Sequence, residues 1–266
     1  MKSQASVIPI TRSSRHGETI LEVNSLRKVF PAGRSFLTVL ADVSFNVARG
    51  EFICLLGRSG CGKSTLLKVL AGFIPPTSGT VFLHGRQVAK PSPDRCVVFQ
   101  EDALFPWLTV RENVAFGLKG KGLERRAVEQ EVDGFLALVG LNDFADYLPR
   151  QLSGGMKQRV ALARVLILRP EVLLMDEPFA SLDALTREEM QNHLLMLWER
   201  FGHTVLFVTH DVHEAVTLAD RVLVMNRALG TIHEELEIHL PRQCRRDHDE
   251  FLRYTRRLIK VLRECP

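Results

Sequence analysis

The sequence predicts an α/β fold built on a buried parallel sheet, and three observations support that prediction. Five short apolar runs have the length and composition of strands covered on both faces, at residues 51–56, 96–100, 172–176, 204–210 and 221–225. A run with helical spacing begins at Lys63, shortly after the first of these strands, and ends at Pro75. A glycine-rich loop at residues 57–62 joins that strand to that helix.

Two parts of the chain depart from this alternation of strands and helices. Residues 20–30, 38–47 and 79–88 are rich in β-forming residues and punctuated by Gly, Pro or Asn, which indicates an antiparallel β subdomain. Helix-forming stretches at 110–118, 123–139 and 141–148 indicate an inserted α-helical subdomain at about 101–164. The sequence contains no internal repeat, so a second copy of the same unit must come from another chain.

Length and composition indicate one compact domain with an insertion: the chain has 266 residues, of which 45% are hydrophobic and 25% charged. We expect a flexible tail at 1–17, the main domain at 18–240 and a short basic helical extension at 241–266. No apolar run approaches the roughly 18 residues needed to cross a bilayer, so the chain is not expected to span a membrane. The five cysteines show neither CxxC pairs nor metal-ligand spacing, which favours a reducing compartment.

The net charge of +4 is concentrated in residues 241–266, where eight basic residues accompany four acidic ones. The rest of the chain is neutral overall, so bulk charge gives no case for nucleic-acid binding and no nucleic-acid partner is expected. Within this extension, residues recur at helical spacing among the arginines: Phe251, Thr255, Leu258, Ile259 and Leu262. We expect this helix to pack on its own subunit, the alternative being a lipid surface.

The glycine-rich loop matches G-x-x-x-x-G-K-[ST], the P-loop that binds nucleoside triphosphates. In such a loop, successive backbone N–H groups turn toward the β-phosphate, and the following helix presents its positive N-terminal end. Lys63 is expected to bridge the β- and γ-phosphates of ATP, and Ser64 to offer its hydroxyl to Mg²⁺. The predicted fold is therefore a P-loop NTPase (RecA-like) core, with ATP-binding residues Gly57, Arg58, Ser59, Gly60, Cys61, Gly62, Lys63, Ser64 and Thr65.

The polar ends of the parallel strands, Gln100, Asp176 and His210, are expected to converge at one edge of the sheet. Asp176 can hold Mg²⁺ through water, and Glu177 can orient and deprotonate the attacking water beside the γ-phosphate. The alternative is that Asp176 and Glu177 are merely two solvated acids at a strand end, and the presence of the P-loop makes that alternative less favourable. Cys61 lies near Lys63 and a helix start, a setting that can lower a thiol's pKa, so alkylation of Cys61 is expected to block ATP hydrolysis.

With these residues assembled, the chain resembles the ATP-binding subunits of ABC transporters over residues 20–230. Leu152-Ser153-Gly154-Gly155 resembles the signature loop that, in the family, caps the γ-phosphate held by the opposite subunit. A hydroxyl and exposed N–H groups at a helix start make a second anion site without its own lysine. The resemblance implies a dimer in which Ser153, Gly154 and Gly155 complete the partner's ATP site, although Ser-Gly-Gly alone is an ordinary helix cap.

Four other positions match the family's site. Gln100 matches the Q-loop glutamine, which joins Mg²⁺ and water to the helical subdomain, and Asp183 matches the D-loop. His210 matches the switch histidine that contacts the γ-phosphate. Phe30 aligns with the aromatic residue that stacks on adenine, usually Tyr, the alternative being a core position. The resemblance thus implies catalytic roles for Glu177, His210 and Gln100, and metal-binding roles for Ser64, Gln100 and Asp176.

Segments 99–107 and 176–187 and the short basic tail resemble the nitrate, sulfonate and taurine import ATPases within this family. The resemblance implies an importer for a small anionic solute, with integral-membrane permease subunits and, indirectly, an extracytoplasmic solute-binding protein as partners. The chain would then lie at the cytoplasmic face of the cell membrane. The apolar run Leu104-Phe105-Pro106-Trp107 either receives a coupling helix of the permease or packs within the insertion.

The sequence departs from the family pattern at two places and leaves alternatives open. Met156 stands where the commonest signature has Gln, and residues 226–230 replace the Arg-Pro-Gly turn usual in this branch. A soluble ABC ATPase without a permease remains possible, although such proteins usually have two ATPase units or long coiled-coil or zinc insertions. A second alternative, a P-loop kinase, would leave residues 152–155 unexplained. A third, an importer for another small solute, is also compatible with the sequence because the permease and the receptor select the solute.

Overall fold

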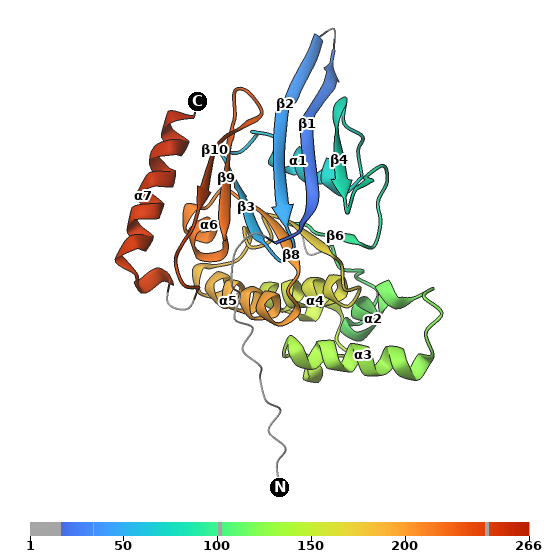
Figure 1. Ribbon diagram of the computed structural model, residues 1–266. Coiled ribbons are helices and arrows are strands. Elements are labelled where there is room, and N and C mark those ends of the chain that lie inside the picture. Colours follow the sequence, from blue (N-terminus) through green and yellow to red (C-terminus); the bar gives the residue numbers. More distant parts are fainter. Residues whose placement is uncertain (1–16, 34, 101–102, 243–244, 266) are drawn as a thin grey trace.

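The computed structural model describes residues 17–33, 35–100, 103–242 and 245–265. Ten strands of these residues form one sheet in the order β5-β4-β1-β2-β10-β9-β3-β8-β7-β6 (Figure 1). The strands are β1 (Thr19–Ala32), β2 (Ser35–Ala48), β3 (Phe52–Leu56), β4 (Ser78–Leu83), β5 (Arg86–Gln87), β6 (Arg95–Val98), β7 (Val172–Asp176), β8 (Thr204–Thr209), β9 (Arg221–Asn226) and β10 (Thr231–Glu237). The longer helices are α1 (Lys63–Leu70), α2 (Val110–Ala115), α3 (Arg125–Leu138), α4 (Gly154–Leu166), α5 (Ala184–Phe201), α6 (Val212–Leu218) and α7 (Asp249–Glu264).

The five apolar runs are confirmed as strands β3, β6, β7, β8 and β9, and the neighbours among them pair in parallel. Strand β3 shows why these runs are apolar throughout. Phe52, Cys54 and Leu56 face one core, shared with α4 to α7, whereas Ile53 and Leu55 face a second core, shared with α1 and the antiparallel strands. Successive side chains of a strand point to opposite faces, so a strand between two cores has no polar face.

The antiparallel β subdomain predicted at 20–30 and 38–47 is formed by β1 and β2. The β-rich segment predicted at 79–88 forms a hairpin of β4 and β5, because His84 and Gly85 turn the chain with φ of 48° and 68°. Strand β10, which the sequence patterns did not indicate, pairs along β9 and makes one parallel bridge to β2. It therefore connects the antiparallel strands to the parallel core.

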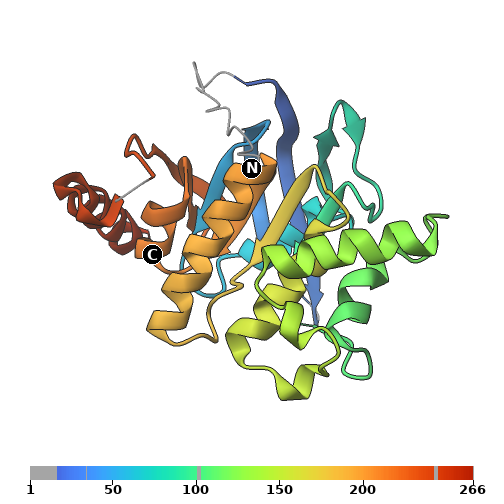
Figure 2. The same cartoon turned by 90° about the horizontal axis from the view of Figure 1, so that it is seen from below.

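Helices α2, α3 and α4 lie together at one flank of the sheet, with α7 at the opposite flank and α5 between them (Figure 2). The helix predicted at 141–148 is wrong: the structure has only a 3₁₀ turn there (Asn142–Phe144). Pro149 explains the difference, because the residue before a proline is disfavoured in helical geometry, and Leu148 is extended. The helix predicted to reach Pro75 ends at Leu70, close to Gly72, whose φ is +77°.

Most of the predicted tail at 1–17 and the first residues of the predicted helical subdomain, 101–102, lie outside the described residues. The extension packs on its own chain as its spacing predicts, since Phe251, Thr255 and Leu258 of α7 are buried. Helix α7 runs beside α6 (Figure 1). No helix among the residues described is both long and apolar enough to span a bilayer.

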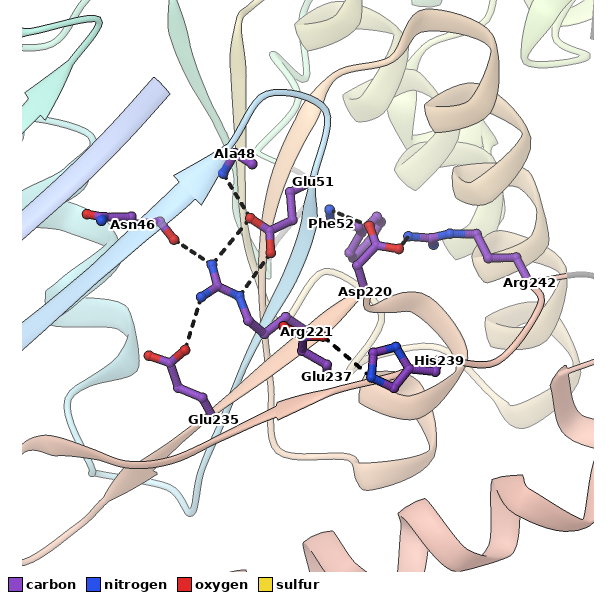
Figure 3. Close-up of polar contacts among 10 residues, drawn as sticks. All are labelled: Asn46, Ala48, Glu51, Phe52, Asp220, Arg221, Glu235, Glu237, His239 and Arg242. Carbon is purple, nitrogen blue, oxygen red and sulfur yellow. Dashed lines mark hydrogen bonds and ion pairs between the residues drawn. The ribbon is translucent and has the colours of Figure 1, made fainter. Parts of the chain in front are cut away.

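The extension is also fixed to the edge of the sheet where β3 begins, opposite the glycine-rich loop (Figure 3). Arg242 lies 2.7 Å from Asp220, which accepts a hydrogen bond from the Phe52 N–H at 3.0 Å. The Arg242 guanidinium also stacks 3.9 Å from the ring of Trp198. Next to it, Arg221 binds both carboxylate oxygens of Glu51, at 2.9 and 3.3 Å. The ion pair and the stacking of Arg242 hold the chain after β10 against the core, and the Arg221–Glu51 pair joins the starts of β9 and β3.

Candidate active site

The candidate site lies where the parallel strands end, at the edge reached by the glycine-rich loop. The loop follows β3, Asp176 is the last residue of β7, and His210 follows β8. Ser64, at the start of α1, donates a hydrogen bond from Oγ to Asp176 Oδ1 at 3.0 Å. Gln100 lies two residues after β6 and is exposed. Ser64 and Asp176 are therefore in direct contact at this edge, where Gln100, Asp176 and His210 are predicted to converge.

The glycine-rich loop is shaped by backbone geometry that only glycine adopts without strain. Gly60 and Gly62 have φ of +82° and +101°, and a Cβ on Gly62 would lie 2.9 Å from the Val39 carbonyl oxygen. Lys63 is buried, and its Nζ donates to the carbonyls of Gly57 and Arg58 at 2.8 and 3.3 Å. The loop thus curls around the lysine ammonium at the N-terminus of α1, a position that favours anions.

Glu177 joins the loop to the end of β8. Its carboxylate lies 3.6 Å from Lys63 Nζ through one oxygen and 2.7 Å from His210 Nδ1 through the other. Its backbone is held too, because the Glu177 N–H donates to the Val208 carbonyl at 3.0 Å. Glu177 has a φ of +46°, a left-handed conformation that is unfavourable for a residue with a side chain. A carboxylate held between an ammonium and an imidazole can orient a water molecule and accept its proton.

The pKa of Asp176 is raised above its ordinary value, first by burial and also by the nearby Glu177 charge, while the Ser64 hydroxyl opposes the shift. A divalent cation would favour the ionised carboxylate again. The oxygens of Ser64 and Asp176 suit Mg²⁺, which is usually bound by one or two carboxylates together with substrate phosphates. The donor set therefore fits the metal that the phosphate loop implies.

Ser153 and Asp183 each begin a helix. Ser153 caps α4 by accepting from the Met156 N–H at 3.3 Å, and Asp183 caps α5 by accepting from the Thr186 N–H at 3.1 Å. The Thr186 hydrogen bonds, from its side chain and its backbone, lower the pKa of Asp183. A Cβ placed on Gly155 would lie 2.7 Å from Thr186 Cγ2, so the starts of the two helices are in tight contact. The first residue of each helix, Gly154 and Ala184, is exposed, and the positive end of a helix suits an anion brought by another molecule.

Two predicted residues have surroundings that the sequence did not reveal. Phe30 is half-buried, with Lys28 Nζ 4.9 Å from the centre of its ring. Cys61 is only 1% exposed, and burial raises the pKa of its thiol even though Lys63 opposes the shift. The predicted low thiol pKa is therefore wrong, because the desolvation of a buried thiolate outweighs a nearby positive charge.

The apolar run Leu104-Phe105-Pro106-Trp107 was expected either to pack within the insertion or to receive a helix of the permease, and it is partly buried and partly exposed. Leu104 is buried, whereas Trp107 is 72% exposed. Phe105 packs against two aromatic rings, with its ring centre 4.3 Å from that of Phe116 and 5.7 Å from that of Trp107. Phe116 is also exposed, so the run anchors itself through Leu104 and presents an aromatic surface through Trp107 and Phe116.

Sequence reasoning missed three buried polar residues that form a hydrogen-bonded chain beginning at Thr209, the neighbour of His210. Thr209, Gln191 and Glu214 are all at most 6% exposed and are connected by hydrogen bonds. The available signal was Glu214, a carboxylate in the mostly apolar stretch 212–219. A charged residue at such a position is usually paired when buried.

Comparisons with known proteins agree with this geometry. The family model described as "ABC transporter" matches residues 40–180. A nitrate import ATP-binding protein of Synechocystis sp. is 48% identical over 83% of this chain and 83% of its own length. A bicarbonate transport ATP-binding protein of the same organism is 46% identical over 93% of this chain and 89% of its own. Among solved structures, the dimeric ATP-binding cassette MJ0796 bound to ADP and Pi matches with a TM-score of 0.73 and 31% identity, over 84% of this chain and 100% of that chain.

Proposed function

The chain belongs to the ABC transporter family, as one of its ATP-binding, ATP-hydrolysing subunits, and we propose that it energises the import of a small anionic solute such as nitrate, a sulfonate or taurine. Support comes from the relatives, whose names refer to nitrate import and bicarbonate transport. The bicarbonate relative also favours a second candidate, an importer ATPase for another small solute. The observation that carries the catalytic proposal is the contact of Glu177 with both Lys63 and His210.

In this proposal the P-loop, residues 57–65, holds the phosphates of ATP. Its backbone N–H groups and the start of α1 attract the β-phosphate, and Lys63 reaches the γ-phosphate when it leaves the loop carbonyls. Ser64 and Asp176 would hold Mg²⁺ through their adjacent oxygens, and Gln100 would be a further oxygen donor. When bound, the metal supplies positive charge that neutralises the phosphate oxygens. Phe30 stacks on the adenine through its ring face.

Glu177 is proposed as the general base and His210 as the group that senses the γ-phosphate. The Glu177 carboxylate accepts a proton from the attacking water, and its contact with His210 holds it in position. Positioning and charge neutralisation dominate phosphoryl transfer, so both side chains act mainly through their placement.

A second copy of the chain is proposed to complete each ATP site. Ser153, Gly154 and Gly155 at the start of α4 would cap the γ-phosphate held by the partner, and Asp183 would lie at the same interface. The related cassette described as a dimer in a post-hydrolysis state supports this arrangement.

The proposed domain boundaries are 18–240 for the ATPase domain, 101–164 for its helical subdomain and 241–266 for the extension. The aromatic surface of Trp107 and Phe116 suits a short helix of an integral-membrane permease subunit. An extracytoplasmic solute-binding protein would act through that permease. The chain would then be a peripheral protein at the cytoplasmic face of the membrane.

The variant Glu177→Gln tests the catalytic proposal. It should bind ATP, accumulate as a dimer and lose turnover by a factor on the order of 100 or more, because the amide cannot accept the proton. Phosphate release gives the turnover, and light scattering after size exclusion with ATP and Mg²⁺ gives the oligomeric state. The matched control is Glu189→Gln on α5, whose carboxylate is exposed and makes one long ion pair to Arg159 at 3.9 Å. Wild-type turnover in Glu177→Gln would refute the assignment.

The solute is tested separately from the chemistry. The chain is co-expressed with candidate permease and receptor proteins, and ATP hydrolysis is measured in vesicles with each solute supplied on the receptor side. Stimulation by nitrate, a sulfonate or taurine supports the proposal, and stimulation by bicarbonate alone favours the second candidate. Failure of the chain to co-purify with any polytopic membrane protein would contradict the importer assignment.

A further inference from the structure

His210 lies between two residues whose side chains hold the local backbone. Before it, the Thr209 hydroxyl oxygen accepts a hydrogen bond from the Asp211 N–H at 3.0 Å. After it, the Asp211 carboxylate caps α6 by accepting from the N–H groups of His213 and Glu214, at 2.7 and 3.3 Å. The backbone around His210 is therefore closed by Thr209 on one side and by the helix cap on the other.

Thr209 is in turn held by a buried carboxylate. Its hydroxyl donates to one oxygen of Glu214 at 2.5 Å, and the other oxygen accepts from Gln191 Nε2 of α5 at 3.1 Å. Glu214 and Gln191 are 6% and 2% exposed, and burial raises the pKa of Glu214. A buried carboxylate whose two oxygens are both bonded has little freedom to move, because losing either bond would leave a buried polar atom unsatisfied.

The far end of this chain of hydrogen bonds is in the C-terminal extension. Gln191 Oε1 accepts from Arg246 Nη2 at 2.5 Å, and a second Arg246 nitrogen pairs with Glu188 at 2.5 Å. Next to it, Arg245 is 2% exposed and donates to the carbonyls of residues 216, 217 and 219, at 3.1, 3.2 and 2.7 Å. Arg245 thereby holds the C-terminal end of α6, the helix that starts just after His210.

We propose that the C-terminal extension positions His210 for ATP hydrolysis through the chain Arg246, Gln191, Glu214 and Thr209. Arg246 orients the Gln191 amide, which fixes the Glu214 carboxylate, which fixes the Thr209 hydroxyl beside His210. Arg246 is a positioning residue, because its contacts with Gln191, Glu188 and Thr217 are with protein groups on α5 and α6. The inference rests on the proposed role of His210, and it gives the extension a part in catalysis.

The test compares steady-state ATP hydrolysis by the purified chain and its variants. Arg246→Ala should lower kcat by about threefold to tenfold and leave KM for ATP within about twofold, since no phosphate-binding group is removed. The Arg246 side chain is 37% exposed, so the variant should fold. The matched control is Arg253→Ala, in the same extension, whose pair is with Glu250 one helical turn away; its kcat should equal that of the wild type.

A double-mutant cycle shows whether the effect passes through Thr209. Thr209→Val removes the hydroxyl and should lower kcat more than Arg246→Ala does, whereas Thr209→Ser keeps the hydroxyl and should restore kcat. The double variant Arg246→Ala with Thr209→Val should be no slower than Thr209→Val alone. If Thr209→Val does not fold, the same cycle is run with Gln191→Met in its place.

The outcomes separate this inference from the function on which it rests. Loss of turnover in His210→Ala together with unchanged kcat in Arg246→Ala overturns the inference and leaves the role of His210 intact. Wild-type turnover in His210→Ala overturns both. Additive losses in the cycle, or a raised KM without a lowered kcat in Arg246→Ala, show that the extension acts by another route.

Discussion

Alanine at Gly155 would test how tightly the starts of α4 and α5 are packed. The added Cβ would lie 2.7 Å from Thr186 Cγ2, whereas carbon atoms in van der Waals contact are about 3.5–4.0 Å apart. An overlap of this size resembles an extra methyl group in a packed core, which costs about 1–3 kcal/mol. Replacing glycine by alanine in a helix also stabilises the helix by up to about 1 kcal/mol, which offsets part of that cost. The expected net loss of folding free energy is therefore about 1 kcal/mol.

Gly154→Ala is the matched control, since it lies one position earlier in the same helix. Its Cβ would lie 3.5 Å from Leu182 Cδ2, an ordinary contact, so only the helical gain should remain and the variant should be slightly stabilised. Thermal unfolding measures both, and Gly155→Ala should melt about 2–4 °C below the wild type.

Thr186→Ser provides the rescue. It removes Cγ2 but keeps the backbone N–H and the hydroxyl that bond to Asp183. The double variant Gly155→Ala with Thr186→Ser should recover most of the lost stability, because the clashing atom is gone. If Gly155→Ala is as stable as Gly154→Ala, or if Thr186→Ser rescues nothing, then the packing described for these two helices is wrong.

Two further predictions follow from the raised pKa values. Burial raises the pKa of Asp176 above its ordinary value of 3.8, so the ionised carboxylate is less favourable in the folded chain than in the unfolded chain at neutral pH. Asp176→Asn removes this cost and should raise the melting temperature at neutral pH. That gain should shrink as the pH falls through the raised pKa of Asp176 and vanish below the ordinary value of 3.8, where the carboxyl is protonated in both states. A gain that is independent of pH would contradict the assignment. Cys61 is buried and has a raised thiol pKa, so it should resist iodoacetamide in the folded chain and react after denaturation. Peptide mass spectrometry measures the modification, and the prediction is contradicted if Cys61 is modified before the other cysteines of the folded chain.

The parts of the fold and site that the sequence predicts depend on local patterns. The parallel strands have continuous apolar runs, and the P-loop has its glycines within nine residues, so both are recognisable without knowing their neighbours. The approach of Ser64 to Asp176 follows from topology, since carboxyl ends of parallel strands meet at one edge.

The parts that the sequence does not predict depend on contacts across the fold. Strand β10 is stabilised by its pairing with β9, and its own residues Glu234, Glu235 and Glu237 do not resemble a strand. The low thiol pKa expected for Cys61 came from its neighbours in sequence, whereas its burial comes from packing against distant strands. The Gln191–Glu214 bond joins residues 23 positions apart in the sequence, on two different helices, which no local pattern reveals.

The left-handed backbone of Glu177 has a consequence for how this position evolves. An L-residue in that conformation is less favourable than glycine by about 1–2 kcal/mol, so the backbone conformation alone favours glycine here. A directed-evolution screen that selected for heat tolerance and ignored turnover would enrich Glu177→Gly, and the selected variants would have lost ATP hydrolysis. At this position the residue that favours stability differs from the residue that catalysis needs. A glutamate that is kept among descendants of this chain therefore indicates selection for catalysis.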